Sequence, residues 1–438
     1  MSTLSRRNLF GLTAGAVVTA GLSACAGSGG SSSGGNNGGG DSNTIEFWSN
    51  HPGKSKATEQ KLIAEFEKAN PNLKVKLVDA GKSYPDVAQK FNAALSGGSL
   101  PDVVIVSDTT WFNFALNDRL ADMSALTSEN KLSTDDYVKG LYDDYKYEDK
   151  HYALPYSRST VIFYYNKDAW KKAGLPDRAP TSWDEFEQWA PKLQSAMGSG
   201  KKAIVLDDGS DYLDWTFQSI AWSYGGGYSK DWTPTMASEG TVKAATKIQG
   251  WAKKGWMQTS KDSQADFASG IGACAIESTG GLAGVIKDAS FKVGIGFLPA
   301  PGGIKTVPTG GAGLAVPKGI SAERQKNAVK FIEFMTNKDN TITFSQATGY
   351  LPVRTSAMDD AKEKAYLEKN PEYAVAVKQL PKARPQDNVR VFLPGGGIDI
   401  GTSLDKIIAG SDVKSTLEAL DKALQAKYDS QIKPKLKK

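Results

Sequence analysis

Apolar and polar residues follow one another along the first third of the chain in the order expected of strands separated by helices. Residues 45–48 and 73–77 are predicted strands, and residues 103–106 form a continuous apolar run typical of a strand buried on both faces. Between them, residues 56–69 place apolar side chains on one helical stripe, and a second helix closes at 91–95. This order predicts a parallel sheet covered by helices.

The same pattern restarts in the middle of the chain. A strand at residues 160–165 leads into a helix that ends near Gly174, and Ser182 with Glu185 predicts a capping box for the next helix. Further strands are predicted at 203–206, 291–298 and 310–316, and further helices at 323–336 and 413–428. Two α/β units in sequence favour two lobes with a ligand cleft between them, at the carboxyl ends of the strands.

The first 24 residues are predicted to be an export signal and to take no part in the fold. Arg6 and Arg7 precede a short uncharged run at residues 9–22, which is too short to span a membrane. Residues 22–25 resemble the lipobox of bacterial lipoproteins, so Cys25 is predicted to be lipidated. A plain secretory peptide with an incidental Cys is the alternative, and both the Tat and the Sec route stay open.

A flexible tether is predicted directly after the lipidated residue, over residues 25–43. Residues 26–43 contain eight Gly, five Ser and three Asn, a composition that cannot build a core. The folded body is therefore expected outside the cytoplasm, anchored to the plasma membrane. With Cys25 acylated, Cys274 is left alone and no internal disulfide is expected.

Composition narrows the possible functions. Lys+Arg 53 against Asp+Glu 48 gives a net charge of +5, which is too even for a nucleic-acid binder that relies on a basic surface. Two His and two Cys argue against a metal site, and no metal or cofactor is predicted. No Gly-x-Ser-x-Gly motif occurs, although the many carboxylates leave a secreted hydrolase open as an alternative. A binding protein is therefore the leading class.

Four motifs resemble one family. They are the segments at residues 156–168, 293–299, 310–313 and 348–353, which include Tyr165-Asn166-Lys167-Asp168 and Thr348-Gly349-Tyr350-Leu351-Pro352. They are similar to the extracellular solute-binding proteins of ABC importers for sugars and polyols. The resemblance implies an α/β, two-lobed periplasmic-binding-protein fold of the type II kind, each lobe a sheet flanked by helices. It also implies a monomer that delivers a small molecule to membrane permease subunits.

Within that family, residues 366–371 and 389–391 look most like the members that bind sn-glycerol 3-phosphate and glycerophosphodiesters. Their ligand contacts, carried over by position, fall on Tyr84, Asp108, Ser159, Thr279, Gly310, Gly311, Tyr350 and Arg390. Asp108 stands where those proteins have Glu, and the register at Thr279 is open by one residue. Arg158 stands where they have a small polar residue, which implies an extra positive charge in the cleft.

Phosphate chemistry fits this set of residues. Arg390 can make a planar two-point contact, and the backbone at Gly310 and Gly311 can approach a ligand closely. Asp108 can accept from two hydroxyls of a glycerol group. Each residue also has a purely structural alternative: a surface ion pair for Arg390, a helix cap for Asp108, a tight turn for the glycines.

A neutral sugar or oligosaccharide is the alternative ligand, and it would favour an aromatic platform. The aromatic residues that could provide one are Trp48, Trp111, Trp215, Trp222 and Tyr224. Of these, Trp48 and Trp222 are predicted to lie in the cleft. His51 and His151 are expected to be loop residues without a role.

Lobe boundaries follow from the likeness as well. One lobe is predicted to combine residues 44–155 and 307–350, and the other 156–306 and 351–438. The chain should cross between the lobes near Tyr156, Thr306 and Leu351. Ligand in the cleft would bridge both lobes and so favour the closed form. The predicted function is a substrate-binding lipoprotein that makes and breaks no bond.

Overall fold

The computed structural model describes residues 42–303 and 306–436. The predicted signal peptide, Cys25 and all but the last two residues of the predicted tether lie outside these residues. Across the described part of the chain, none of the helices is both long enough and apolar enough to span a bilayer. Cys274 is buried and forms no disulfide within the described residues.

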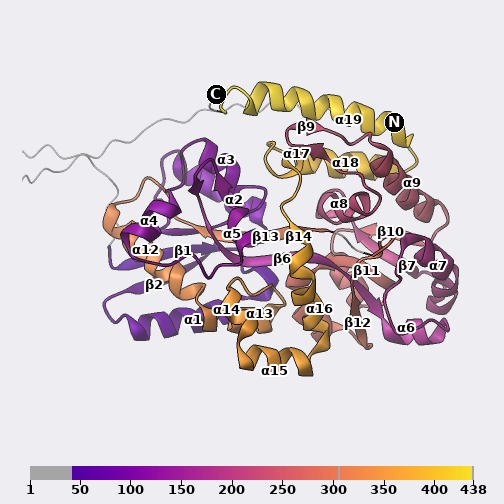
Figure 1. Cartoon of the computed structure of the whole chain (residues 1–438), viewed down its shortest axis with the longest axis horizontal. Helices are drawn as coiled ribbons and strands as arrows, with labels where there is room; N and C mark the ends of the chain where they lie inside the picture. The colour runs from indigo at the N-terminus through magenta and orange to yellow at the C-terminus, as the bar shows by residue number, and fades with distance from the viewer. Residues whose placement is uncertain (1–41, 304–305, 437–438) are drawn as a thin grey trace, which may run out of the picture. The chain divides into compact units, whose positions relative to one another are not determined.

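A single ten-stranded sheet organises the described chain (Figure 1). Its main path runs β10-β7-β11-β6-β13-β3-β1-β2, with β12 pairing β6 and β14 pairing β13. The strands are β1 (Thr44–Ser49), β2 (Lys74–Asp79), β3 (Val103–Ser107), β6 (Leu154–Asn166), β7 (Lys202–Asp207), β10 (Met257–Ser260), β11 (Gly272–Ser278), β12 (Val293–Gly296), β13 (Val307–Ala315) and β14 (Ala383–Arg384). Two small hairpins pair β4 (Lys146–Tyr147) with β5 (Lys150–His151), and β8 (Ser229–Lys230) with β9 (Thr233–Pro234).

Helices pack on the sheet and cover it. Those before β11 are α1 (Lys56–Ala69), α2 (Tyr84–Leu95), α3 (Trp111–Leu116), α4 (Met123–Glu129), α5 (Lys139–Asp143), α6 (Lys167–Lys172), α7 (Trp183–Met197), α8 (Leu213–Ser223), α9 (Glu239–Lys253) and α10 (Ser263–Ala268). Those after it are α11 (Leu282–Asp288), α12 (Ala322–Met335), α13 (Lys338–Thr348), α14 (Thr355–Asp359), α15 (Ala361–Lys369), α16 (Pro371–Gln379), α17 (Asn388–Val391), α18 (Gly396–Ile408) and α19 (Val413–Lys427).

The predicted α/β order is confirmed, with shifts at several element ends. β1 pairs in parallel with both β2 and β3, and β7 pairs in parallel with both β10 and β11. The strand predicted at 291–298 is shorter, Val293–Gly296, and the one predicted at 310–316 starts earlier, at Val307. Ser182 caps α7 by accepting from the Glu185 N–H, whereas the Glu185 carboxylate accepts from the Thr181 N–H.

Two long antiparallel strands, β6 and β13, lie at the centre of the sheet and join its two parallel halves. All 13 residues of β6 are buried, and their register with β13 shifts between Ala312 and Gly313. The Leu351 N–H donates to the Arg158 carbonyl at 2.7 Å, which adds a third segment to this centre. The three segments predicted to carry the chain between lobes therefore lie side by side, while the lobe boundaries themselves stay a prediction.

Candidate functional site

A cavity of about 750 Å³ opens at the carboxyl ends of the parallel strands. The residues that follow β1, β2, β3 and β7, and those that end β11, meet around it, as expected for a ligand site in an open α/β sheet. Its lining also includes the start of α8, the middle of β13, and the turn that opens α18. The lining residues used below are His51, Lys54, Lys82, Tyr84, Asp108, Ser159, Asp211, Tyr212, Asp214, Trp215, Gln264, Glu277, Ser278, Gly280, Gly310, Gly311, Tyr350, Arg390 and 395–398.

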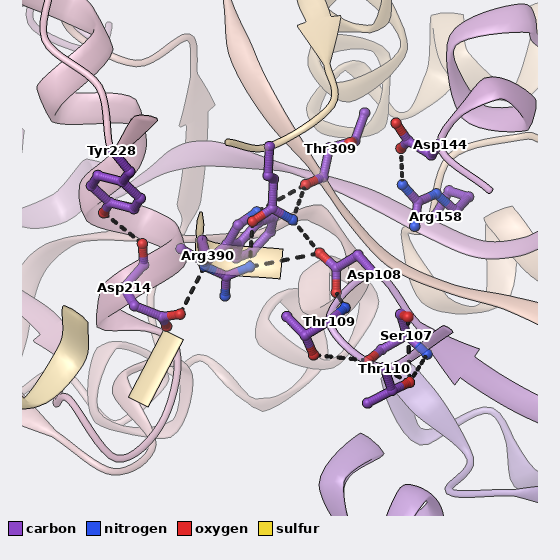
Figure 2. A network of polar contacts seen from close by, with 12 residues as sticks. Ser107, Asp108, Thr109, Thr110, Asp144, Arg158, Asp214, Tyr228, Thr309 and Arg390 are labelled. Atoms are coloured by element: carbon purple, nitrogen blue, oxygen red, sulfur yellow. Dashed lines mark hydrogen bonds and ion pairs between the residues drawn. The ribbon is translucent and has the colours of Figure 1, made fainter. Parts of the chain in front are cut away.

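Arg390 lies in the wall of this cavity between two carboxylates (Figure 2). Its side chain is 4% exposed; Nε lies 2.7 Å from Asp214 Oδ2, and Nη1 lies 3.8 Å from Asp108 Oδ2. Nη1 also donates to Gln386 Oε1, and the Gln386 amide donates to Asp108 and, at 2.7 Å, to the Thr309 carbonyl. The guanidinium is therefore fixed in position and its charge is balanced within the protein.

Asp108 is the first residue after β3, and the sheet itself positions it. Its N–H donates to the Gly311 carbonyl at 3.0 Å, and its carboxylate accepts from the Thr109 N–H at 3.0 Å. Burial raises the pKa of the Asp108 carboxyl, although Arg390 and Arg158 act in the opposite direction. Burial raises the pKa of Asp214 as well, again against Arg390.

Gly310 and Gly311 occupy positions that no larger residue fits. A Cβ at Gly310 would lie 2.4 Å from the indole ring of Trp215, whose Nε1 donates to the Thr309 carbonyl at 3.0 Å. Gly311 has φ +93°, and a Cβ there would lie 1.9 Å from the Ser157 carbonyl oxygen. Bare backbone and the flat Trp215 ring thus form one continuous surface in the cavity.

Hydroxyl groups line another part of the wall. Tyr84 Oη lies 3.3 Å from Ser157 Oγ and 3.3 Å from Tyr350 Oη. The Tyr350 ring packs on Gly280, where a Cβ would lie 2.5 Å from it. Burial raises the pKa of Tyr84 to about 12, so this hydroxyl stays protonated and can donate a hydrogen bond. Ser159 lines the cavity beside them.

Seven predicted site residues therefore share one cavity: Tyr84, Asp108, Ser159, Gly310, Gly311, Tyr350 and Arg390. The surface alternative for Arg390 is wrong, because the side chain is buried among Asp214, Asp108 and Gln386. Contact of these residues with a ligand stays a prediction.

Arg158 does not supply the extra charge expected in the cleft. Its side chain, on β6, is fully buried, donates to Tyr145 Oη at 2.8 Å, and forms an ion pair with Asp144 (Figure 2). The Asp144 carboxylate compensates the charge of Arg158, so this charge is not available to a ligand in the cleft. The prediction that it lines the cleft is corrected accordingly.

Three further predicted residues lie outside the lining. Thr279 is fully buried and its Oγ1 accepts from the Thr160 N–H at 3.3 Å; its neighbours Ser278 and Gly280 line the cavity instead. Trp48 donates to Glu46 at 2.6 Å, and Trp222 donates to Asp387 at 3.2 Å, so both indoles are committed to structural contacts. Trp215, named only as one possible platform, is the tryptophan in the cavity wall.

Other residues of the site belong to no recognisable motif, and the sequence did not predict their role. Asp214 orients Arg390, and Gln386 joins Arg390 to Asp108 from just behind the wall. His51, expected to have no role, also lines the cavity, and its Nδ1 lies 2.5 Å from the buried Glu59 carboxylate. The sequence offered one signal for Asp214: it lies within the apolar start of α8, and a buried carboxylate needs a partner.

The described residues contain no group of three or more His, Cys, Asp or Glu side chains arranged to hold a metal ion.

Comparison with known proteins gives concordant matches. The model of the bacterial extracellular solute-binding protein family matches residues 61–375. The sn-glycerol-3-phosphate-binding periplasmic protein UgpB of Salmonella paratyphi A is 27% identical over 402 residues, covering 87% of this chain and 91% of that protein.

Two solved structures extend these matches. UgpB from Mycobacterium tuberculosis, in complex with glycerophosphocholine, is 48% identical, with a TM-score of 0.86 over 89% of this chain and 99% of that one. The GacH receptor of Streptomyces glaucescens, solved unliganded and with acarbose, is 24% identical, with a TM-score of 0.75 over 88% of this chain and 98% of that one. The second likeness shows the shared two-lobed fold alone.

Proposed function

We propose, from the premise that this chain belongs to the bacterial extracellular solute-binding protein family, that it captures a glycerophosphodiester for an ABC importer. Members of this family are binding proteins. The 48% identical relative was solved with glycerophosphocholine, and the 27% identical relative is named for sn-glycerol 3-phosphate. Closure of the two lobes on the ligand would present the loaded protein to its permease.

The observation that carries the ligand class is the position of Arg390. A buried guanidinium in a cavity wall, next to hydroxyl groups and bare glycine backbone, is chemistry suited to a phosphate oxygen. Asp108, held beside it by Gln386, can accept hydrogen bonds from adjacent hydroxyls of a glycerol group. The phosphate-binding Arg390 and the hydroxyl-binding Asp108 lie next to each other, as the phosphate and the hydroxyl groups do in a glycerol phosphate.

Charge favours a phosphodiester over a phosphate monoester. Arg390 already faces Asp108 and Asp214, so the wall offers little uncompensated positive charge. A diester brings one negative charge at neutral pH, whereas a monoester brings nearly two. Repulsion from the two carboxylates therefore weakens binding of the monoester more, and glycerol 3-phosphate is expected to bind less tightly.

A neutral sugar or oligosaccharide is the second candidate. The Trp215 ring in the cavity wall favours it, because sugars pack well on flat aromatic faces. A neutral ligand would place no demand on the charge of Arg390, which separates the two candidates experimentally.

The remaining features of the proposed function concern location and chemistry. Cys25 would carry the lipid anchor and residues 26–43 would tether a monomeric body outside the plasma membrane. We assign no catalytic step to the chain; the hydrolase alternative would require product release that depends on a single carboxylate.

Isothermal titration calorimetry of the purified protein tests this proposal with sn-glycero-3-phosphocholine, sn-glycerol 3-phosphate and maltose. We expect the tightest binding with the diester, and a loss of roughly 100-fold or more in Arg390→Ala. Arg384→Ala is the matched control, because Arg384 packs on Trp222 outside the cavity lining. Thermal unfolding of each variant separates lost binding from lost folding. Binding of maltose alone, unaffected by Arg390→Ala, would overturn the proposal in favour of the sugar.

A further inference from the structure

Three carboxylates gather at one edge of the cavity, where β7 and β11 end. Asp207 ends β7, Glu277 lies near the end of β11, and Asp211 follows β7 in the turn before α8. Because β7 and β11 are parallel neighbours, their carboxyl ends bring these side chains to one edge of the sheet. Asp211 and Glu277 are part of the cavity lining.

No Lys or Arg of the described residues forms an ion pair with these three carboxylates. Glu277 accepts from Ser263 Oγ, from Gln264 Nε2 at 3.0 Å and from the Ser278 N–H at 3.0 Å, all neutral donors. The Asp211 carboxylate has no hydrogen bond or ion pair within the described chain. Negative charge in this wall is therefore unbalanced, in contrast to the charge around Arg390.

Asp207 gives a second, independent observation. Its side chain is 1% exposed, and its Oδ2 has no hydrogen-bond partner among the described residues. Burial and the adjacent Glu277 raise the pKa of Asp207 well above its ordinary value. Asp207 lies outside the cavity lining, whereas Glu277 and Asp211 are part of it.

An aromatic face lies beside these carboxylates. Tyr212 follows Asp211 directly and is 38% exposed. Few other large apolar side chains of the described residues are exposed. Its ring centroid lies 6.4 Å from that of Trp215. Aromatic faces next to carboxylates are the usual surroundings of bound ammonium groups.

We infer that Asp211, Glu277 and the face of Tyr212 form a subsite for a cationic headgroup, a quaternary or primary ammonium. The inference rests on the proposed function, because it places the headgroup of a glycerophosphodiester whose phosphate lies at Arg390. It assigns the ligand class as zwitterionic phosphodiesters of the choline or ethanolamine kind. The anionic part of such a ligand then lies at Arg390, and its cationic end lies at Asp211 and Glu277.

This subsite makes binding depend on pH. Burial and the nearby Glu277, Asp208, Asp262 and Asp214 raise the pKa of Asp211 to about 7. The cations that line the cavity are Lys54, Lys82 and Arg390, and His51 lines it too. A bound ammonium favours ionised Asp211, so protons compete with it as pH falls through 7.

Calorimetry with two diesters tests the inference. sn-Glycero-3-phosphocholine carries the cation, and sn-glycero-3-phosphoglycerol shares the glycerol phosphate but has a neutral headgroup. In Asp211→Asn we expect affinity for the choline ester to fall by about 5-fold or more, while affinity for the glycerol ester changes by less than about 2-fold. Asp266→Asn is the charge-matched control in the same part of the fold, since Asp266 lies outside the cavity lining.

A pH series completes the test. Between pH 8 and pH 6 the wild type should lose affinity for the choline ester but not for the glycerol ester, and Asp211→Asn should remove that difference. Equal losses for both diesters in Asp211→Asn, or no loss for either, would overturn the cation subsite while the proposed function stands. Failure of the wild type to bind either diester would overturn the proposed function, and the subsite with it.

Discussion

Substituting Gly311 by Ala should destabilise the protein through the backbone alone. Gly311 lies in β13 with φ +93°, a conformation that an Ala backbone adopts only with strain. The new Cβ would also lie 1.9 Å from the carbonyl oxygen of Ser157, which is held by the pairing of β13 with β6. Since that oxygen belongs to the backbone, it cannot move aside as a flexible side chain would.

Both contributions can be given a magnitude. A residue held at an unfavourable positive φ costs about 1–3 kcal/mol, and forcing an extra methyl group into a packed site costs another ~1–3 kcal/mol. We therefore expect the free energy of unfolding to fall by about 3 kcal/mol. With a shift of ~2 °C per kcal/mol in a large domain, Tm should fall by roughly 6 °C.

Thermal and urea unfolding, followed by tryptophan fluorescence, measure this loss. Gly140→Ala is the matched control, because Gly140 is helical and a Cβ there meets nothing within 4 Å. The control should be neutral or stabilised by about 0.5–1 kcal/mol. If Gly311→Ala stays within about 0.5 kcal/mol of the wild type, the reasoning from backbone geometry is refuted.

Three further predictions follow from single contacts. Asp211→Asn should stabilise the unliganded protein more at pH 8 than at pH 5 in urea titrations. A carboxyl whose folded-state pKa is raised to about 7 costs no stability below its unfolded pKa of about 4, an increasing amount between the two values, and the full amount above 7; an unchanged pH profile would contradict this. Ser182→Ala should cost about 1 kcal/mol of unfolding free energy, since it removes the acceptor for the Glu185 N–H at the start of α7, and a cost below about 0.3 kcal/mol would speak against the cap. Trp215→Leu should weaken ligand binding at least about 5-fold in calorimetry, whereas Trp222→Phe should not, and the reverse order would show that the wrong indole has been placed in the cavity.

Periodicity predicted helices that have one polar face, such as α1 and α12, and a capping box predicted α7. It missed α8, because ten of its eleven residues are buried and no polar stripe marks it as a helix. The ends of β12 and β13 were misplaced because glycine and proline on either side carry little pattern. Local sequence thus predicted the fold class better than the element boundaries.

The sequence predicted only those site residues that belong to recognisable motifs. Residues within recognisable segments, such as Tyr350 and Arg390, do lie in the cavity wall. Arg158, in the same kind of segment, is instead buried against Asp144, and sequence alone does not reveal which arginine has a partner. Tryptophans were the least predictable, because an indole in the core and one in a cleft have the same sequence context.

The central position of β13 has a consequence for how the chain reaches its final structure. Its partners β3 and β6 are made long before it, since Gly313 pairs with Val106, about two hundred residues earlier. Until residues 307–315 have been synthesised, both partners present unpaired strand edges in an otherwise apolar region. A nascent chain therefore cannot finish its first α/β unit early, and truncations that end before β13 should aggregate rather than yield a folded half.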